Sequence, residues 1–210
     1  MGKLVLVRHG ESVWNAKGLW TGRTDIDLTE NGREQARKAG EAIKDLSFAI
    51  AFTAPLIRTR HTLDEIKAIL VDKTFPDYID PALTERDYGE LTGKNKWEVE
   101  KEYGEEQFTK WRRSWDTPPP GGESLKDVYT RLIPFYETLV APRLKEGQNV
   151  LIVSSGNELR ALTKYLENIS DQDIEHFEIK TGEVHEYDID KEGNVVKKTV
   201  LATNSDPGKQ

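Results

Sequence analysis

An arginine and a histidine stand together at the end of an apolar segment near the N-terminus. Lys3–Val7 is almost continuously hydrophobic, which is typical of a strand buried in a parallel sheet, and Arg8, His9 and Gly10 follow it directly. Ligands of open α/β sheets bind at the carboxyl ends of the strands. The triplet therefore predicts an active site. The alternative is a histidine with a purely structural role, hydrogen-bonded to a neighbouring carbonyl at the end of the strand.

The residue types present limit which side chain could act as a covalent nucleophile. The chain has no cysteine and no G-x-S-x-G nucleophile elbow, so covalent catalysis would have to use another residue. A neutral imidazole attacks phosphorus readily, which makes His9 the candidate nucleophile for phosphoryl transfer. Such transfer also needs an acid to protonate the leaving oxygen, and Glu85 is the candidate, provided that it is partly buried.

Arginines recur at the predicted element boundaries and in an aromatic-rich stretch. They are Arg8, Arg58, Arg86, Arg112 and Arg113. The guanidinium group binds phosphate and carboxylate through two parallel hydrogen bonds. Several of them within reach of His9 would form a site for a multiply charged anion, whereas a single one would be an ordinary surface residue.

Apolar strands alternate with amphipathic helices along the chain, which predicts an α/β three-layer α/β/α sandwich with a mostly parallel sheet. We expect one domain over residues 1–210. The predicted elements are strands over 3–7, 47–52 and 149–153, helices that begin near Thr29, Pro55 and Ser124, a helix directly after 149–153, and a hairpin of 184–189 with 195–201. Residues 85–123 are expected to form an insertion of short helices over the sheet without a core of its own. The tail, about 202–210, is expected to be mobile.

Composition limits the partners. The net charge of −7 argues against a general nucleic-acid or membrane-surface role, and no apolar run approaches the 18 residues of a membrane span. The first residues form a strand and not a secretory signal. The sequence therefore predicts a cytoplasmic protein whose ligands are small molecules.

Several motifs together resemble the histidine phosphatase superfamily, and within it the 2,3-bisphosphoglycerate-dependent phosphoglycerate mutases. The resemblance extends from about residue 3 to about residue 190. It is carried by Leu6–Ser12 with Trp14 and Asn15, Thr21–Gly22, Asp25–Thr29, Leu56–Thr62, Leu83–Gly89, Asn95–Lys96, Trp111–Arg113, Gly156–Asn157, Leu159–Leu162 and Thr181–Gly182.

The resemblance implies interconversion of 3-phosphoglycerate and 2-phosphoglycerate, in glycolysis and gluconeogenesis, through a phosphohistidine on His9. The primer would be 2,3-bisphosphoglycerate, no metal would be needed, and a homodimer or homotetramer is expected. By analogy Arg8 and Arg58 would hold the transferring phosphoryl group, and Glu85 would be the acid and base. The substrate-binding residues implied in the same way are Asn15, Thr21, Gly22, Arg86, Tyr88, Lys96, Arg112, Arg113, Gly156 and Asn157.

Two departures from the family pattern keep alternatives open. Ser155 stands where the family has a second histidine, and a lost preorganised donor typically costs about 10²–10³ in rate. The segment 117–123 is shorter than the corresponding connection in many members, so the pocket would be less covered and would admit water. The alternatives are a histidine-type phosphatase acting on phosphoglycerates and a non-catalytic phosphoglycerate-binding variant.

Overall fold

The computed structural model describes residues 1–202, so the predicted mobile tail lies outside the described residues, except that Ala202 ends the last strand. The centre of the fold is a six-stranded sheet in the order β3-β2-β4-β1-β5-β6. Its strands are β1 (Gly2–Arg8), β2 (Ile50–Thr53), β3 (Asp77–Ile79), β4 (Val150–Ser154), β5 (Val184–Ile189) and β6 (Val195–Ala202). The first four run parallel, and β5 and β6 form the predicted antiparallel hairpin. The mostly parallel sheet is confirmed.

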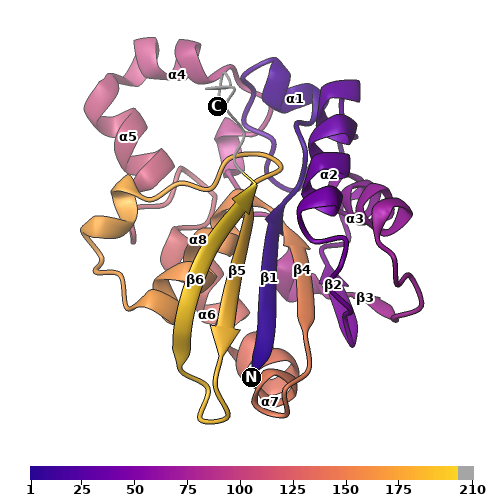
Figure 1. The fold of residues 1–210 in the computed structure, drawn as a ribbon. Helices are drawn as coiled ribbons and strands as arrows, with labels where there is room; N and C mark the ends of the chain where they lie inside the picture. The colour runs from indigo at the N-terminus through magenta and orange to yellow at the C-terminus, as the bar shows by residue number, and fades with distance from the viewer. Residues whose placement is uncertain (203–210) are drawn as a thin grey trace.

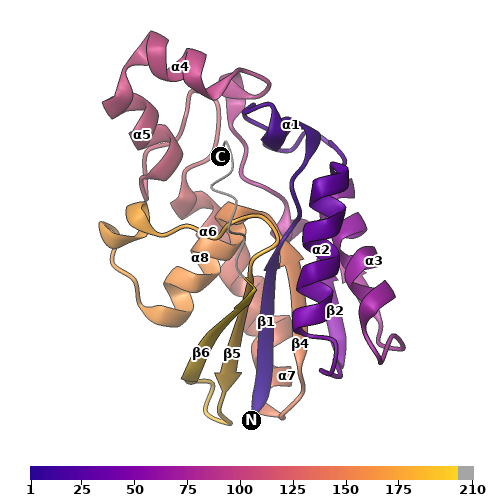
Figure 2. The same cartoon turned by 45° about the horizontal axis from the view of Figure 1, so that its top comes forward.

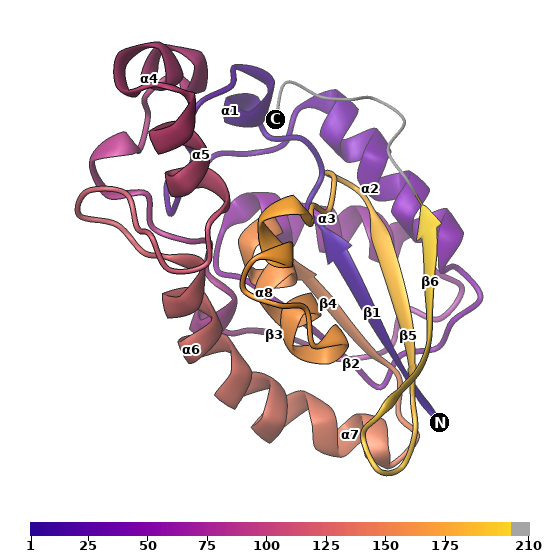
Figure 3. The same ribbon diagram turned by 90° about the vertical axis from the view of Figure 1, so that its left-hand side faces the viewer.

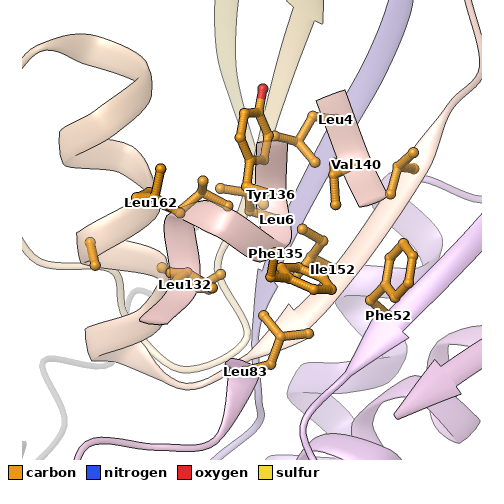
Figure 4. Packing of buried hydrophobic residues seen from close by; sticks show 14 of the residues in the cluster. Leu4, Leu6, Phe52, Leu83, Leu132, Phe135, Tyr136, Val140, Ile152 and Leu162 are labelled. Carbon is orange, nitrogen blue, oxygen red and sulfur yellow. The ribbon is translucent and has the colours of Figure 1, made fainter. Parts of the chain in front are cut away.

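Helices cover both faces of the sheet, as the three-layer prediction requires (Figures 1 and 2). One face carries α2 (Glu30–Ala42) and α3 (Ile57–Ile69), and the other carries α6 (Leu125–Phe135) and α8 (Gly156–Glu167). Each face has its own buried apolar cluster. Figure 4 shows the larger cluster, where Leu6 and Ile152 of the central strands meet Leu132 and Leu162 of the helices.

The central strand β1 pairs with β4 in parallel and with β5 in antiparallel register. Arg8 is aligned with Ser154, so the polar ends of β1 and β4 lie next to each other. The amide of His9 donates a 3.0 Å hydrogen bond to the carbonyl of Ser154. This pairing brings the two glycine-containing strand ends of the sequence to one edge of the sheet.

The insertion differs from its prediction in one respect. Its helices α4 (Lys96–Tyr103) and α5 (Glu105–Arg113) stand beyond the carboxyl ends of the strands and not over a face of the sheet (Figures 1 and 3). They also have a separate apolar cluster formed by Trp20, Leu91, Val99, Phe108 and Trp111. The expectation of no core was wrong because Trp20, from the irregular loop after β1, supplies a large buried ring that the helices enclose.

The helix starts were predicted well where the cap is local. Thr29 caps α2, and Ser124 forms a capping box with Asp127 at the start of α6. In contrast, α3 begins at Ile57 and not at Pro55. Asp25 of the preceding loop accepts a 2.6 Å hydrogen bond from the Ile57 amide, a cap that is distant in sequence.

The remaining elements are short. They are α1 (Val13–Ala16), the 3₁₀ turns η1 (Pro81–Leu83), η2 (Gly89–Leu91) and η4 (Asp173–His176), the π-helical turn η3 (Tyr136–Val140) and α7 (Ala141–Lys145). No helix among residues 1–202 is both long and apolar enough to cross a bilayer.

Candidate active site

A polar pocket opens at the carboxyl ends of β1 and β4. Twelve residues predicted for the site line it: Arg8, His9, Asn15, Thr21, Arg58, Glu85, Tyr88, Lys96, Arg112, Arg113, Gly156 and Asn157. They come from six separate stretches of the chain. The fold therefore brings the predicted cations, the imidazole and the carboxyl group to one place.

His9 is held in one defined state. Its side chain is 2% exposed, and Nδ1 lies 2.7 Å from the carbonyl oxygen of Gly10. Because a carbonyl can only accept, Nδ1 carries the proton and Nε2 keeps its lone pair. Burial, together with the guanidinium groups of Arg58 and Arg8, holds the pKa of His9 well below its usual value. At neutral pH the imidazole is a neutral nucleophile.

Arg58 connects the first turn of α3 to the loop that follows β1. Its two terminal nitrogens donate to the carbonyl groups of Thr24 and Gly22, at 2.9 and 2.8 Å. Gly22 has a φ of +52°, a left-handed conformation that favours glycine and lets its carbonyl turn toward the arginine. Arg58 thus fixes the loop and presents a buried positive charge to the pocket.

Glu85 follows the turn η1 and is 8% exposed. Its Oε1 accepts hydrogen bonds from the Arg86 amide at 2.8 Å and from Nδ2 of Asn157 at 2.9 Å. The same Nδ2 donates to the Tyr88 hydroxyl at 2.8 Å. Asn157 lies in the first turn of α8, so the helix that follows β4 fixes the carboxyl group of Glu85.

The outer wall of the pocket belongs to the insertion. Burial lowers the pKa of Lys96 to about 7, and the guanidinium groups of Arg112 and Arg8 act in the same direction. Arg113 forms a 2.9 Å ion pair with Glu178. Burial alone would raise the pKa of Glu178, but the Arg113 guanidinium holds it below its usual value. This wall is a cluster of crowded cations that an anion would stabilise.

Three predicted residues do not line the pocket. Gly22 lies behind it as the acceptor of Arg58. Arg86 is fully buried and donates to the carbonyl of Trp111 at 2.8 Å, so it supports the insertion from within and does not face the pocket. Its direct contact with substrate, which the resemblance implied, has no geometric support.

Ser155 is the third of these residues. It is the N-cap residue of α8 and is fully buried, and its Oγ has no hydrogen-bond partner among the described residues. The next residue, Gly156, lets the helix approach Arg8, because a Cβ there would lie 3.3 Å from the Arg8 Cζ. Ser155 therefore places an unpaired polar group behind the lining residue Gly156 and not in the pocket itself.

Sequence reasoning missed five lining residues, which are Leu19, Trp20, Arg160, Glu178 and Ile179. Arg160 has a readable signal, an arginine on the buried side of the helix after 149–153. It donates to Oδ1 of Asn157 at 3.1 Å and to the carbonyl of Arg113 at 3.0 Å. Glu178 carries no such signal, because an acid in an irregular segment looks like any surface charge.

The other histidines stand apart from the pocket. His61 is bonded to Asp27 at 2.7 Å on the outer side of α3, and His185 is buried on β5 against Glu183. Neither they nor His176 line the pocket. Residues 1–202 contain no group of three or more His, Cys, Asp or Glu side chains placed to hold a metal ion.

The sequence profile of the histidine phosphatase superfamily (branch 1) matches residues 4–201. A protein of Nitrobacter hamburgensis named 2,3-bisphosphoglycerate-dependent phosphoglycerate mutase is 47% identical over 201 residues, which cover 95% of this chain and 97% of that protein. The chain belongs to this mutase family of the histidine phosphatase superfamily.

Further comparisons agree with membership of the mutase family. A protein of the same name from Cytophaga hutchinsonii is 48% identical over 182 residues, covering 85% of this chain and 84% of that protein. Among solved structures, a mycobacterial glucosyl-3-phosphoglycerate phosphatase superimposes with a TM-score of 0.84 over 97% of this chain and 100% of its own, at 23% identity. That structural likeness shows that the fold is shared.

Proposed function

We propose that the chain interconverts 3-phosphoglycerate and 2-phosphoglycerate through a phosphohistidine on His9, primed by 2,3-bisphosphoglycerate. The observation that carries the proposal is the neutral His9 imidazole, with its Nε2 lone pair free, in a pocket lined by arginines. The mutase relatives supply the substrate class.

The reaction begins when Nε2 of His9 attacks a phosphorus atom of the bisphosphoglycerate. A P–N bond forms as the P–O bond breaks, and Glu85 gives its proton to the leaving alkoxide oxygen. In the productive cycle, the hydroxyl group of a monophosphoglycerate attacks phosphohistidine while Glu85 takes its proton. The bisphosphoglycerate then turns, and its other phosphoryl group returns to His9. No water is consumed.

The pocket divides the work between its inner and outer walls. Arg8 and Arg58, with Asn15 and the α8 amides of Gly156 and Asn157, stabilise the phosphoryl group in flight. The outer residues Thr21, Tyr88, Lys96, Arg112 and Arg113 hold the second phosphate and the carboxylate. We assign Gly22 and Arg86 to indirect roles, because each supports a lining residue from behind.

A phosphatase that uses the same His9 is the second candidate, and Ser155 favours it. Without the family's second histidine, phosphohistidine has one cationic donor fewer, and water competes with the substrate hydroxyl. The decisive experiment supplies labelled 2,3-bisphosphoglycerate and 3-phosphoglycerate and compares labelled 2-phosphoglycerate with released inorganic phosphate. Dominant phosphate release would refute the mutase proposal.

A non-catalytic phosphoglycerate-binding protein is separated by the same labelling. It would bind the ligands but acquire no acid-labile, base-stable label on His9. A His9→Asn variant is the matched control, since it keeps the arginine-lined pocket and removes the acceptor. A cytoplasmic location and a homodimer or homotetramer complete the proposal, and light scattering of the purified chain tests the latter.

A further inference from the structure

We infer that Glu158, acting through Arg131, is a positioning residue that fixes the segment Ala82–Asp87 and thereby the carboxyl group of Glu85. The inference rests on the proposed role of Glu85 as acid and base. Neither Glu158 nor Arg131 lines the pocket. Glu158 lies on α8, and Arg131 lies on α6. Both belong to the neighbouring helices α6 and α8 on one face of the sheet (Figure 2).

Glu158 lies in the first turn of α8 but does not cap the helix. Ser155 and Glu158 have the spacing of a capping box, but Ser155 makes no side-chain cap bond. The Glu158 side chain is instead fully buried, and its Oε1 accepts a 3.1 Å bond from Arg131. Burial and the nearby Glu85 carboxyl raise the pKa of Glu158 well above its usual value. Burying a carboxyl group is costly unless a hydrogen-bond partner compensates, and the partner here is Arg131.

Arg131 donates hydrogen bonds to the backbone of the segment that precedes Glu85. One terminal nitrogen donates to the carbonyl of Ala82, and the other donates both to the carbonyl of Thr84 and to Glu158. Its side chain is 23% exposed. Glu158 thus shares one terminal nitrogen of Arg131 with the Thr84 carbonyl and holds the guanidinium where both carbonyl bonds are made.

The segment is fixed at its other points as well. Ser154 at the end of β4 donates through Oγ to the carbonyl of Leu83 at 3.0 Å. Glu123 accepts from the amide of Asp87 at 2.9 Å and lies 3.5 Å from the Nε of Arg131. Glu85 therefore lies in the middle of a segment that is hydrogen-bonded on both sides, and its carboxyl group accepts a hydrogen bond from Asn157. The first turn of α8 reaches Glu85 twice, directly through Asn157 and indirectly through Glu158.

A purely structural ion pair is the competing explanation, since buried pairs also occur without any catalytic role. The two explanations differ in how the loss depends on the leaving group. A displaced acid slows transfer from a phosphoglycerate, whose alkoxide leaving group needs a proton, but not from p-nitrophenyl phosphate, whose phenolate leaves without one. General damage to the pocket slows both.

The experiment measures single-turnover phosphorylation of His9 by 2,3-bisphosphoglycerate and by p-nitrophenyl phosphate in Glu158→Ala and Glu158→Gln. A misplacement of about 1 Å costs about 10²-fold, so we expect Glu158→Ala to lose about 10–100-fold with the bisphosphoglycerate and less than about threefold with the aryl phosphate. Glu158→Gln keeps an acceptor for Arg131 and is expected to recover most of the rate.

Two further variants test the inference independently of Glu158 and control for the loss of a carboxyl group. Arg131→Lys keeps the charge but cannot reach the three acceptors at once, and it should show the same dependence on the leaving group even if Glu158→Ala fails to fold. Glu65→Ala removes a partly buried carboxyl group that likewise bonds arginines across two helices, Arg33 and Arg37 of α2, but lies away from Glu85, and it should change neither rate. Equal losses with both donors, or a Gln variant as slow as the Ala variant, would overturn the inference. Absence of phosphohistidine in the unaltered protein would instead refute the proposed function.

Discussion

Replacing Glu85 by glutamine isolates proton transfer from binding. The Oε1 of Glu85 accepts from the Arg86 amide and from Asn157, and a glutamine oxygen can accept both bonds in the same place. The side chain is only 8% exposed, so the packed surroundings hold the new residue in position. What the variant loses is the ability to give a proton to the leaving oxygen and to take one from the attacking hydroxyl.

The expected cost follows from that single loss. General acid–base catalysis contributes about 10²–10⁴-fold, equivalent to about 2.7–5.5 kcal/mol in the barrier. The variant also removes one negative charge from a pocket rich in cations, so anionic substrates should bind equally well or slightly better. We therefore expect kcat to fall by about 10²–10⁴ while KM stays constant or decreases.

The assay couples 2-phosphoglycerate formation to enolase and measures kcat and KM separately, with substrate affinity checked by calorimetry. The Arg86→Gln variant is a useful contrast, because it disturbs the neighbouring support of the insertion and not the acid. A fall in kcat of less than tenfold, or a fall matched by an equal loss of affinity, would show that Glu85 only positions the substrate.

The remaining predictions concern charge and protonation in the same pocket. Ser155→His should restore a donor and raise the rate of His9 phosphorylation by up to about 10²–10³-fold, measured by rapid quench; no gain would mean that other donors already compensate. The pKa of Lys96 is about 7, so anion binding, which raises it, should take up a proton at pH 8 and hardly any at pH 6. Calorimetry in two buffers measures that uptake, and Lys96→Met should abolish it. Because the folded state depresses the pKa of His9, the unfolded chain binds the extra proton, and stability should fall as the pH drops below about 6.5. Urea unfolding at pH 7 and pH 5 checks this, and His9→Asn should show a smaller decrease.

The sheet and its helices were predictable because their signals are local and periodic. The continuous apolar strands β1 and β4, and the caps Thr29 and Ser124, each depend on residues within one turn or one strand. The start of α3 was misplaced because its cap, Asp25, lies 32 positions before Ile57. The core of the insertion was missed because Trp20, which packs against α4 and α5, comes from a loop far from them in the sequence.

The site shows the same division between local and distant information. Most residues predicted at strand ends or in motifs line the pocket, because a cation or an imidazole after an apolar strand lies where the sheet opens. Arg86 sits next to Glu85 in the same motif but is turned inward to the carbonyl of Trp111, and no pattern in one sequence distinguishes the two directions. Glu158 and Arg131 were not singled out, because their significance arises only when α6 and α8 meet beside Ala82–Asp87.

The balance between mutase and phosphatase chemistry depends on the outer wall more than on His9. A neutral imidazole and two arginines serve transfer to an alcohol or to water equally well. In the proposed mutase cycle the bisphosphoglycerate must stay bound while it turns, and we expect the cations of α4 and α5 to hold its second phosphate. Glu178 already neutralises part of Arg113 at 2.9 Å, so the ligand must displace that carboxylate or share the guanidinium with it. In the proposed cycle we therefore expect Glu178 to compete with the ligand's anionic groups for Arg113, and the fraction of label lost as inorganic phosphate measures how well the intermediate is retained.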